Sequence, residues 1–209
     1  MKKTPNQQKI KNRGYSLVEV LVAITILIIA VIAPMTVASR GIQVGVFARE
    51  QATAIFLAQE AIEMVTAVRN EYALLALKDS NSDLLWDWVG NEASKPLRWC
   101  FVVGHGCNVY WGQGGGAGDI VTENCDNSPD SCRMFYNDSA SRGRYVIDSL
   151  GGDPTPFRRL MRLEEGVDDG VVNVRVRVEW GSNLFGGGTQ SVELSSVVRN
   201  VYADLLPEP

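Results

Sequence analysis

The stretch "KNRGYSLVEVLVAITILIIA", residues 11–30, opens an apolar run that continues to residue 38 and decides how the rest of the chain is arranged. An apolar helix of about 20 residues is long enough to cross a bilayer core. We therefore expect residues 15–38 to form a membrane-spanning helix. Glu19 interrupts this run, and a carboxylate at a helix centre in a membrane costs roughly 2.5–3.5 kcal/mol. That cost predicts a compensating partner for Glu19.

A cluster of positive charge precedes the apolar run. Five basic residues and no acidic residue come before Gly14, whereas charges just after the run are sparse and partly balanced. The basic residues are Lys2, Lys3, Lys9, Lys11 and Arg13. This bias places the amino terminus in the cytoplasm and the rest of the chain outside. A secretory signal peptide would instead have a short apolar core that ends at a small-residue cleavage site, and here the apolar run continues without a clear stop.

Gly14 lies between the basic cluster and the apolar run, and Tyr15 and Glu19 follow it. This order resembles the prepilin-type cleavage and methylation motif of type IV pilins and type II secretion pseudopilins. The resemblance implies that a membrane aspartic peptidase cuts between Gly14 and Tyr15 and then methylates the new amine of Tyr15. The family prefers phenylalanine as the first mature residue, where this chain has tyrosine. Glu19 occupies the fifth mature position.

Elementary electrostatics supplies a reason for Glu19. Cleavage after Gly14 would create an ammonium on Tyr15, and residues four apart share a helix face. The carboxylate would then pair with its own terminus or with that of a neighbouring subunit. Its place near a helix amino terminus is also favoured by the helix dipole. The alternative is an interfacial glutamate that lipid headgroups solvate.

The helical pattern continues well beyond the membrane run. Residues 35–77 contain no proline, and apolar side chains recur there at spacings of three and four, which predicts a helix with an apolar stripe. The stripe comprises Ala54, Leu57, Ala58, Ala61, Val65, Val68, Tyr72 and Leu75, while Glu60, Glu63 and Asn70 fall on another face. One helix over residues 17–77 would be roughly 90 Å long. We expect Pro34 to kink it and Gly41 and Gly45 to loosen the turns that follow.

The carboxyl-terminal part is expected to form strands. The predicted strands are residues 97–103, 132–136, 144–148, 157–163, 171–180 and 190–201, and residues 78–95 read as a short helix or loop. In residues 171–180, valines alternate with polar residues, so the valine face should lie on the long helix and the other face in solvent. A glycine-rich turn leads into the last strand, which predicts a hairpin. Helix first and antiparallel sheet second is an α+β arrangement, which the pilin resemblance also implies.

The predicted organisation has four parts. They are a cleaved basic leader (residues 1–14), a membrane-spanning helix that would form a filament core (15–38), its amphipathic continuation (39–77) and an extracytoplasmic α+β head with disulfide-bearing loops (78–209). Within the head, residues 151–202 resemble minor pilins of the PilV type and the related pseudopilin I subunit.

The head contains four cysteines, Cys100, Cys107, Cys125 and Cys132, in two pairs with six intervening residues each. Structural zinc sites usually pair cysteines two to four residues apart, so this spacing argues against zinc. An even count in an extracytoplasmic domain favours disulfides, with three possible connectivities. The sequential pairing is preferred because each bridge would close a short polar loop. Crossed or nested pairing and reduced cysteines stay open.

The sequence shows no convincing catalytic or ligand signature. Glu164-Glu165 and Asp168-Asp169 are adjacent carboxylates of a turn and are expected to be solvated. The run "GQGGGAG" lacks the following lysine and serine of a phosphate loop, and His105 has no nucleophile signature around it. Removing residues 1–14 takes away five positive charges and changes the formal charge from −4 to −9, which does not favour nucleic acid. We expect neither enzymatic activity nor a cofactor or metal.

These observations together predict a structural subunit of a type IV pilus-like filament. By the resemblance, its partners are other pilin subunits, the prepilin peptidase and methyltransferase, and a pilus or secretion assembly platform. It would be a single-pass membrane protein before assembly and extracellular afterwards. The alternatives are a type II secretion pseudopilin, a membrane-anchored binding module that never polymerises, and an anchored zinc domain. Family filaments serve adhesion, twitching, DNA uptake or secretion, and the sequence does not choose among them.

Overall fold

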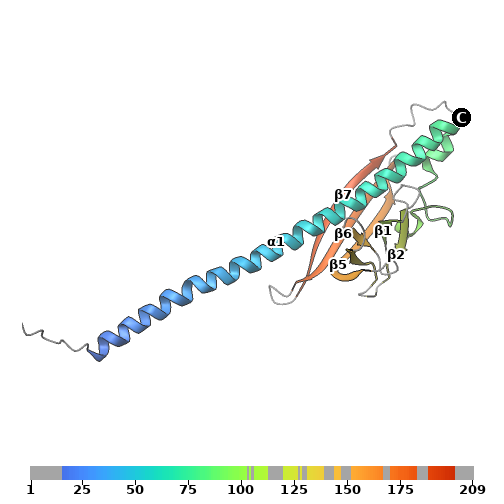
Figure 1. The fold of residues 1–209 in the computed structure, drawn as a ribbon. Helices are drawn as coiled ribbons and strands as arrows, with labels where there is room; N and C mark the ends of the chain where they lie inside the picture. Colours follow the sequence, from blue (N-terminus) through green and yellow to red (C-terminus); the bar gives the residue numbers. More distant parts are fainter. Residues whose placement is uncertain are drawn as a thin grey trace, which may run out of the picture. The chain divides into compact units, whose positions relative to one another are not determined.

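The computed structural model describes residues 16–102, 104, 106–112, 120–126, 128, 131–138, 144–146, 152–166, 170–182 and 188–200. By packing, the chain divides into two units, Met1–Val46 and Phe47–Pro209. Helix α1, Leu17–Asp79, begins in the first unit and ends in the second (Figure 1). The predicted helix of residues 17–77 is therefore confirmed to within two residues.

Within its described residues, the second unit combines the end of α1 with two short helices and seven strands. The short 3-10 helices are η1, Ser82–Trp86, and η2, Arg98–Cys100. The strands are β1, Cys107–Trp111; β2, Ile120–Asn124; β3, Arg133–Asn137; β4, Arg144–Val146; β5, Asp153–Glu165; β6, Val171–Ser182; and β7, Gly188–Arg199. The α+β class with a long amino-terminal helix and a carboxyl-terminal antiparallel sheet is confirmed.

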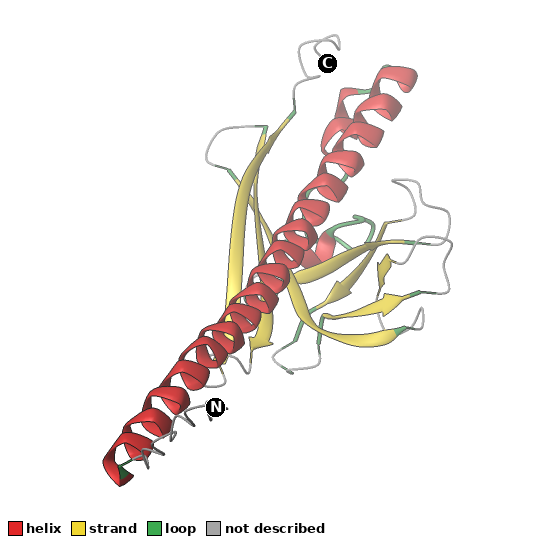
Figure 2. Ribbon diagram, turned by 60° about the vertical axis from the view of Figure 1, so that its left-hand side comes forward, coloured by secondary structure: helices red, strands yellow, loops and turns green. Residues whose placement is uncertain are grey.

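The sheet is built around β5. Along one edge β5 pairs with β6, which pairs with β7, and the predicted hairpin is present with Val174 opposite Ser196. Along the other edge the first part of β5 pairs with β3, and Met161 pairs with Cys107 of β1. Strand β4 adds to β3, and β2 adds to β1, so every pairing is antiparallel. Figure 2 shows the strands in two groups beside the helix.

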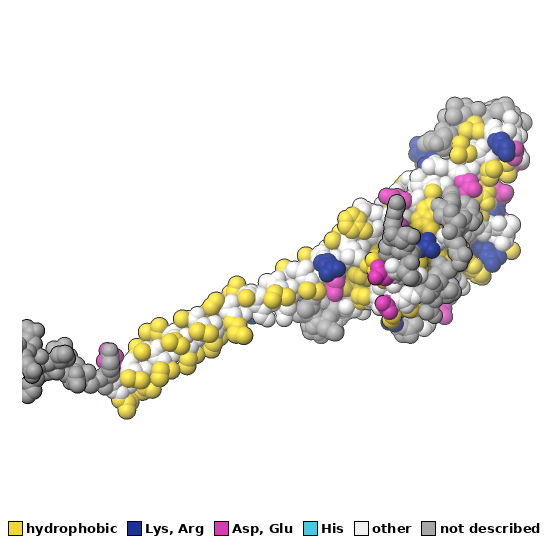
Figure 3. All heavy atoms as spheres, in the orientation of Figure 1, with side chains coloured by type: hydrophobic (Ala, Val, Ile, Leu, Met, Phe, Trp, Pro, Cys, Tyr) yellow, Lys and Arg dark blue, Asp and Glu magenta, His cyan; other side chains and the backbone are white. Residues whose placement is uncertain are grey.

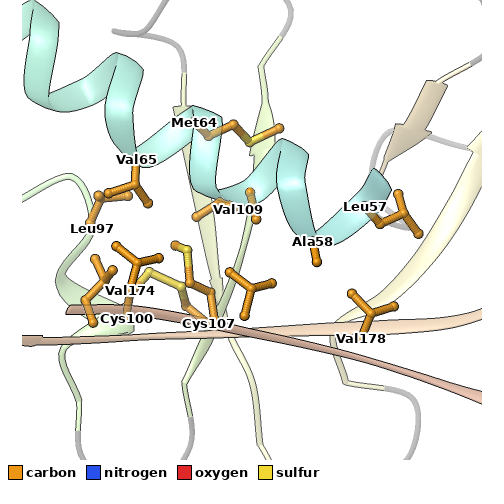
Figure 4. Packing of buried hydrophobic residues seen from close by; sticks show 14 of the residues in the cluster. Leu57, Ala58, Met64, Val65, Leu97, Cys100, Cys107, Val109, Val174 and Val178 are labelled. Atoms are coloured by element: carbon orange, nitrogen blue, oxygen red, sulfur yellow. A yellow bond between two sulfur atoms is a disulfide. The ribbon is translucent and has the colours of Figure 1, made fainter. Parts of the chain in front are cut away.

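The core forms between α1 and the inner face of this sheet. The alternation in β6 buries its valines and Trp180 and exposes Asn173, Arg175 and Arg177, as predicted. The valines meet small and branched side chains of α1, among them Ala58 and Val65 (Figure 4). Burying an apolar side chain of this size stabilises by about 1.5–3 kcal/mol. This apolar contact explains why the helix lies on the sheet.

Two features of the strand prediction are wrong. Residues 97–102 of the predicted strand 97–103 do not form a strand, because η2 and a bend occupy them. The Cys100–Cys107 disulfide and the positive φ angles of Gly104 and Gly106 fold the chain back before a strand begins. Strands β1 and β2 were not predicted, since the buried residues of β1 are consecutive and give no alternation.

The apolar stripe of the helix is confirmed only up to Val68. Tyr72 is half-buried and Leu75 is exposed, whereas Ala73 and Ala76 are buried against Leu85 of η1. The stripe shifts because this end of α1 packs on η1 instead of the sheet. A spacing pattern cannot show which element a helix meets.

Candidate processing and assembly segment

The predicted cleavage site, Gly14 and Tyr15, lies outside the described residues. The described chain begins at Ser16, whose carbonyl accepts a hydrogen bond from the amide of Val20 at 3.2 Å. Glu19 is therefore in the first turn of α1, and it is exposed. Ser16 and Glu19 have the three-residue spacing of a capping box, a sequence signal for the start of a helix. The helix dipole also favours a carboxylate at this position.

The helix surface that follows is apolar on all sides. Within the first unit, the large side chains of α1 are exposed. The most apolar stretch of this helix is long enough to cross a membrane, and none of it is buried. Figure 3 shows hydrophobic side chains along this part of the helix. Within residues 20–38 the polar side chains are Thr25 and Thr36, whose hydroxyls donate to the carbonyls of Val22 and Ala33 of the same helix at 2.8 Å. A helix that is hydrophobic all round belongs in a bilayer or against other helices.

Pro34 stands inside this helix, which continues without a break on both sides of it. Proline has no amide hydrogen, so the carbonyl four residues earlier receives no bond from it. A Cβ atom added at Gly41 or Gly45 would meet nothing within 4 Å, so neither glycine is required for packing in the isolated chain. The kink at Pro34 and the looser turns at the two glycines stay predictions.

A model of the family described as "Prokaryotic N-terminal methylation motif" matches residues 9–33. The chain has a prepilin-type amino terminus. The matched residues include the basic cluster, Gly14, Tyr15, Glu19 and most of the apolar run. No curated protein sequence and no solved structure matches the chain.

The prepilin motif supports a type IV pilin-like or pseudopilin-type subunit that is anchored in a membrane by one helix. Proteins with this motif are processed by a prepilin peptidase and assemble with other pilin subunits. The family is structural and not enzymatic.

Behind the prepilin motif, the head is tied to α1 by a buried cation that the sequence did not reveal. Arg159 of β5 is fully buried. Its Nη1 donates to Oε2 of Glu60 at 2.9 Å and to the carbonyl of Leu57 at 3.0 Å. Its Nε donates to Oδ1 of Asn108 at 2.9 Å, and its Nη2 donates to the carbonyl of Val109. One side chain thus joins α1, β1 and β5.

Burial lowers the pKa of the Arg159 guanidinium, and the Glu60 carboxylate opposes that shift. The group stays charged because an arginine pKa is far above neutral pH. The assignment of Glu60 to a separate polar face is therefore wrong: its side chain is only 38% exposed and reaches the interior. Arg159 alternates with Arg158 and shares its face of β5 with the buried Phe157 and Met161, so the two-residue period of the strand was the signal in the sequence that could have shown its burial.

The structure pairs the four cysteines sequentially, Cys100 with Cys107 and Cys125 with Cys132. All four are buried, and no thiol is left free to bind zinc. Both bridges are at the same end of the β1–β2 pair, where Cys107 lies opposite Asn124 and the amide of Cys125 donates to Gly106. They fasten the loops that enter and leave this pair.

Glu164 and Glu165 are the remaining candidates that the described residues include. Both are exposed at the end of β5. His105, Asp168-Asp169 and the run of residues 113–118 lie outside the described residues.

Proposed function

We propose that this chain is a structural subunit of a type IV pilus-like filament, inserted in the membrane as a prepilin, cut after Gly14 and methylated on Tyr15. The observation that carries this proposal is the sequence of features in one short segment. A basic leader and Gly14 precede a helix that has Glu19 in its first turn and whose large apolar side chains are exposed within the first unit. That apolar surface needs a bilayer first and other helices afterwards.

Glu19 would connect these two states. In the mature chain its carboxylate is one helical turn from the Tyr15 amine, and in a filament it would neutralise that amine or the amine of a neighbouring copy. An ion pair in a low-dielectric core is costly to break, so pairing at this position would set the register between subunits. Copies that share one heterologous contact build an open helical filament.

The charges on either side of the helix support the orientation. Five basic residues precede Gly14, which favours a cytoplasmic leader and an extracytoplasmic head. The two disulfides of the head suit an oxidising compartment. After assembly the head would face the medium at the filament surface.

Mass spectrometry of the chain purified from producing cells tests this function. We expect a mature amino terminus at Tyr15 carrying one methyl group, and recovery of the chain in sheared filaments. Gly14→Val is the control, because a branched side chain at the cleavage position should retain the leader. An intact leader on the wild-type chain would contradict the proposal.

A pseudopilin of a type II secretion system is the alternative within this class, and residues 151–202 favour a minor subunit of the PilV or pseudopilin I type. Deleting the gene for this chain separates the two. Loss of surface pili with secretion preserved supports the pilus subunit, and loss of secreted enzymes with pili preserved supports the pseudopilin. A processed chain that is never found in filaments would indicate an anchored binding module.

A further inference from the structure

The outer face of the sheet carries a group of three arginines on neighbouring strands. The alternation that buries the valines of β6 places Arg175 and Arg177 outside, and Arg162 of β5 lies directly opposite Arg175. Together with Leu160, Glu179 and Glu193 they line a hollow of about 230 Å³. We call Arg162, Arg175 and Arg177 the basic face.

Local partners leave much of this positive charge accessible. Arg175 and Glu193 are 3.6 Å apart, with both side chains more than half exposed. Arg177 is 2.9 Å from Glu179, and Nη2 of Arg162 donates to the carbonyl of Gly104 at 3.1 Å. Two carboxylates therefore serve the three guanidinium groups of the basic face, each of which has five donors, and Glu179 also lies 3.8 Å from Arg158. Like charges directly opposite each other in a sheet repel, so an anion from outside would relieve the Arg162–Arg175 pair.

The rest of the mature chain is acidic, since its formal charge is −9 once the leader is removed. One exposed group of carboxylates lies where α1 ends and η1 begins. It comprises Asp79, Asp83 and Asp87, of which Asp87 contacts Lys95 at 2.6 Å. We call these three residues the acidic end. It belongs to the helical side of the second unit, whereas the basic face belongs to the outer side of the sheet.

We infer that the basic face binds the acidic end of a second copy of this chain. Carboxylates are the planar acceptors that an arginine fork binds in pairs. The three carboxylates of the acidic end match the three arginines in number and would meet them at short range. Because the two surfaces are different, the contact is heterologous and repeats from head to tail. This inference rests on the proposed function, which requires such a repeating contact.

Photo-crosslinking in producing cells tests the contact with the full-length chain. A benzophenone amino acid replaces Ser195, which is exposed and lies opposite Arg175 in the register. We expect a crosslink from position 195 to a peptide of a second copy that contains residues 79–87. Arg175→Glu should reduce its yield at least about fivefold, because one attractive contact becomes repulsive. Adding Asp83→Arg to Arg175→Glu should restore part of the yield by exchanging the two charges.

Arg49→Glu is the matched control, since it makes the same change of net charge at an exposed residue of α1 outside both the basic face and the acidic end and should not reduce the crosslink. Retention of both disulfides in every variant, read by non-reducing peptide mapping, verifies folding. Three results overturn the inference: no crosslink to a second copy, crosslinks only to a different protein or a polyanion, or a yield that Arg175→Glu does not change. If the chain is nevertheless methylated on Tyr15 and present in filaments, the proposed function stands and only this contact fails. A chain that keeps its leader would contradict both the proposed function and this contact.

Discussion

Arg159 and Glu60 form an ion pair with an Nη1–Oε2 distance of 2.9 Å that joins β5 to α1. The arginine is fully buried, while the glutamate remains 38% exposed in its side chain. The pair therefore connects the helix that carries the prepilin motif to the sheet that follows. The positive charge of the buried Arg159 is thus balanced by a carboxylate of α1.

Breaking this pair should destabilise the head. We expect Glu60→Ala to lower the free energy of unfolding by about 2–4 kcal/mol, because it leaves a buried guanidinium with one charge partner fewer. Glu60→Gln keeps an acceptor oxygen and should cost less. Chemical denaturation of the detergent-solubilised chain measures both. Glu63→Ala is the matched control, since Glu63 is exposed on the same helix. Equal effects at the two positions would contradict the role of the pair.

Each disulfide should stabilise the head to a similar extent. Each closes a loop with a sequence separation of seven residues, for which the chain-entropy model gives about 2–3 kcal/mol. We expect Cys100→Ala/Cys107→Ala and Cys125→Ala/Cys132→Ala to lower the unfolding free energy by that amount. Peptide mapping without reductant checks the pairing directly. A peptide that joins Cys100 or Cys107 to Cys125 or Cys132 would show a different connectivity.

Two glycines of one loop allow a matched comparison. Gly106 has φ +86°, and an added Cβ would lie 2.8 Å from the carbonyl oxygen of Met161. Gly104 has φ +105° and an added Cβ would meet nothing within 4 Å. Gly104→Ala should therefore cost only the backbone strain, about 1–2 kcal/mol, and Gly106→Ala clearly more, because β5 must also move. Thermal unfolding of the two variants tests the order, and a smaller loss for Gly106→Ala would refute it.

Alkaline pH should weaken the head through buried tyrosines. Burial and then the nearby Glu123 carboxylate raise the pKa of Tyr110 above its usual value of 10.0. Burial likewise raises the pKa of Tyr72 and Tyr145. The folded chain keeps these protons after the unfolded chain has lost them. The stabilisation is therefore complete below pH 10 and is lost as the pH rises from there through the folded-state pKa values.

Tyr110→Phe removes one of these groups. Its unfolding free energy should decline less than that of the wild type above pH 10, while below that pH the difference between the two should be constant. Denaturation series at several pH values measure this. Parallel curves across the whole range would show that Tyr110 does not contribute.

Glu19 should matter for assembly and not for insertion. We expect Glu19→Ala to leave membrane insertion intact or improved, because a carboxylate is costly in an apolar span. Its entry into filaments should fall, since the Tyr15 amine loses its partner. Glu19→Asp keeps the charge and is the control. Immunoblots of membrane and sheared-filament fractions give the ratio, and normal filament entry of Glu19→Ala would show that our interpretation of the carboxylate is wrong.

The sequence by itself determined the features that depend on local pattern. The long apolar run after Glu19 predicts the amino-terminal helix, because a helix satisfies all backbone hydrogen bonds within one segment in lipid. The alternation in residues 171–180 predicts which face of β6 is buried, since successive side chains of a strand point to opposite faces. The basic cluster, Gly14 and Glu19 identify the prepilin motif without any knowledge of the head.

Only the tertiary structure decided the features that depend on which elements meet. Arg159 is buried because β1 and α1 supply its acceptors, and these are about 50 and 100 residues away in sequence. The neighbouring Arg158 points to the other face of β5, because successive side chains of a strand alternate between its two faces. The unpredicted strands β1 and β2 and the shift of the helix stripe onto η1 also depend on which elements meet. The periodicity of one segment shows which of its faces is apolar, and it does not record which other segment covers that face.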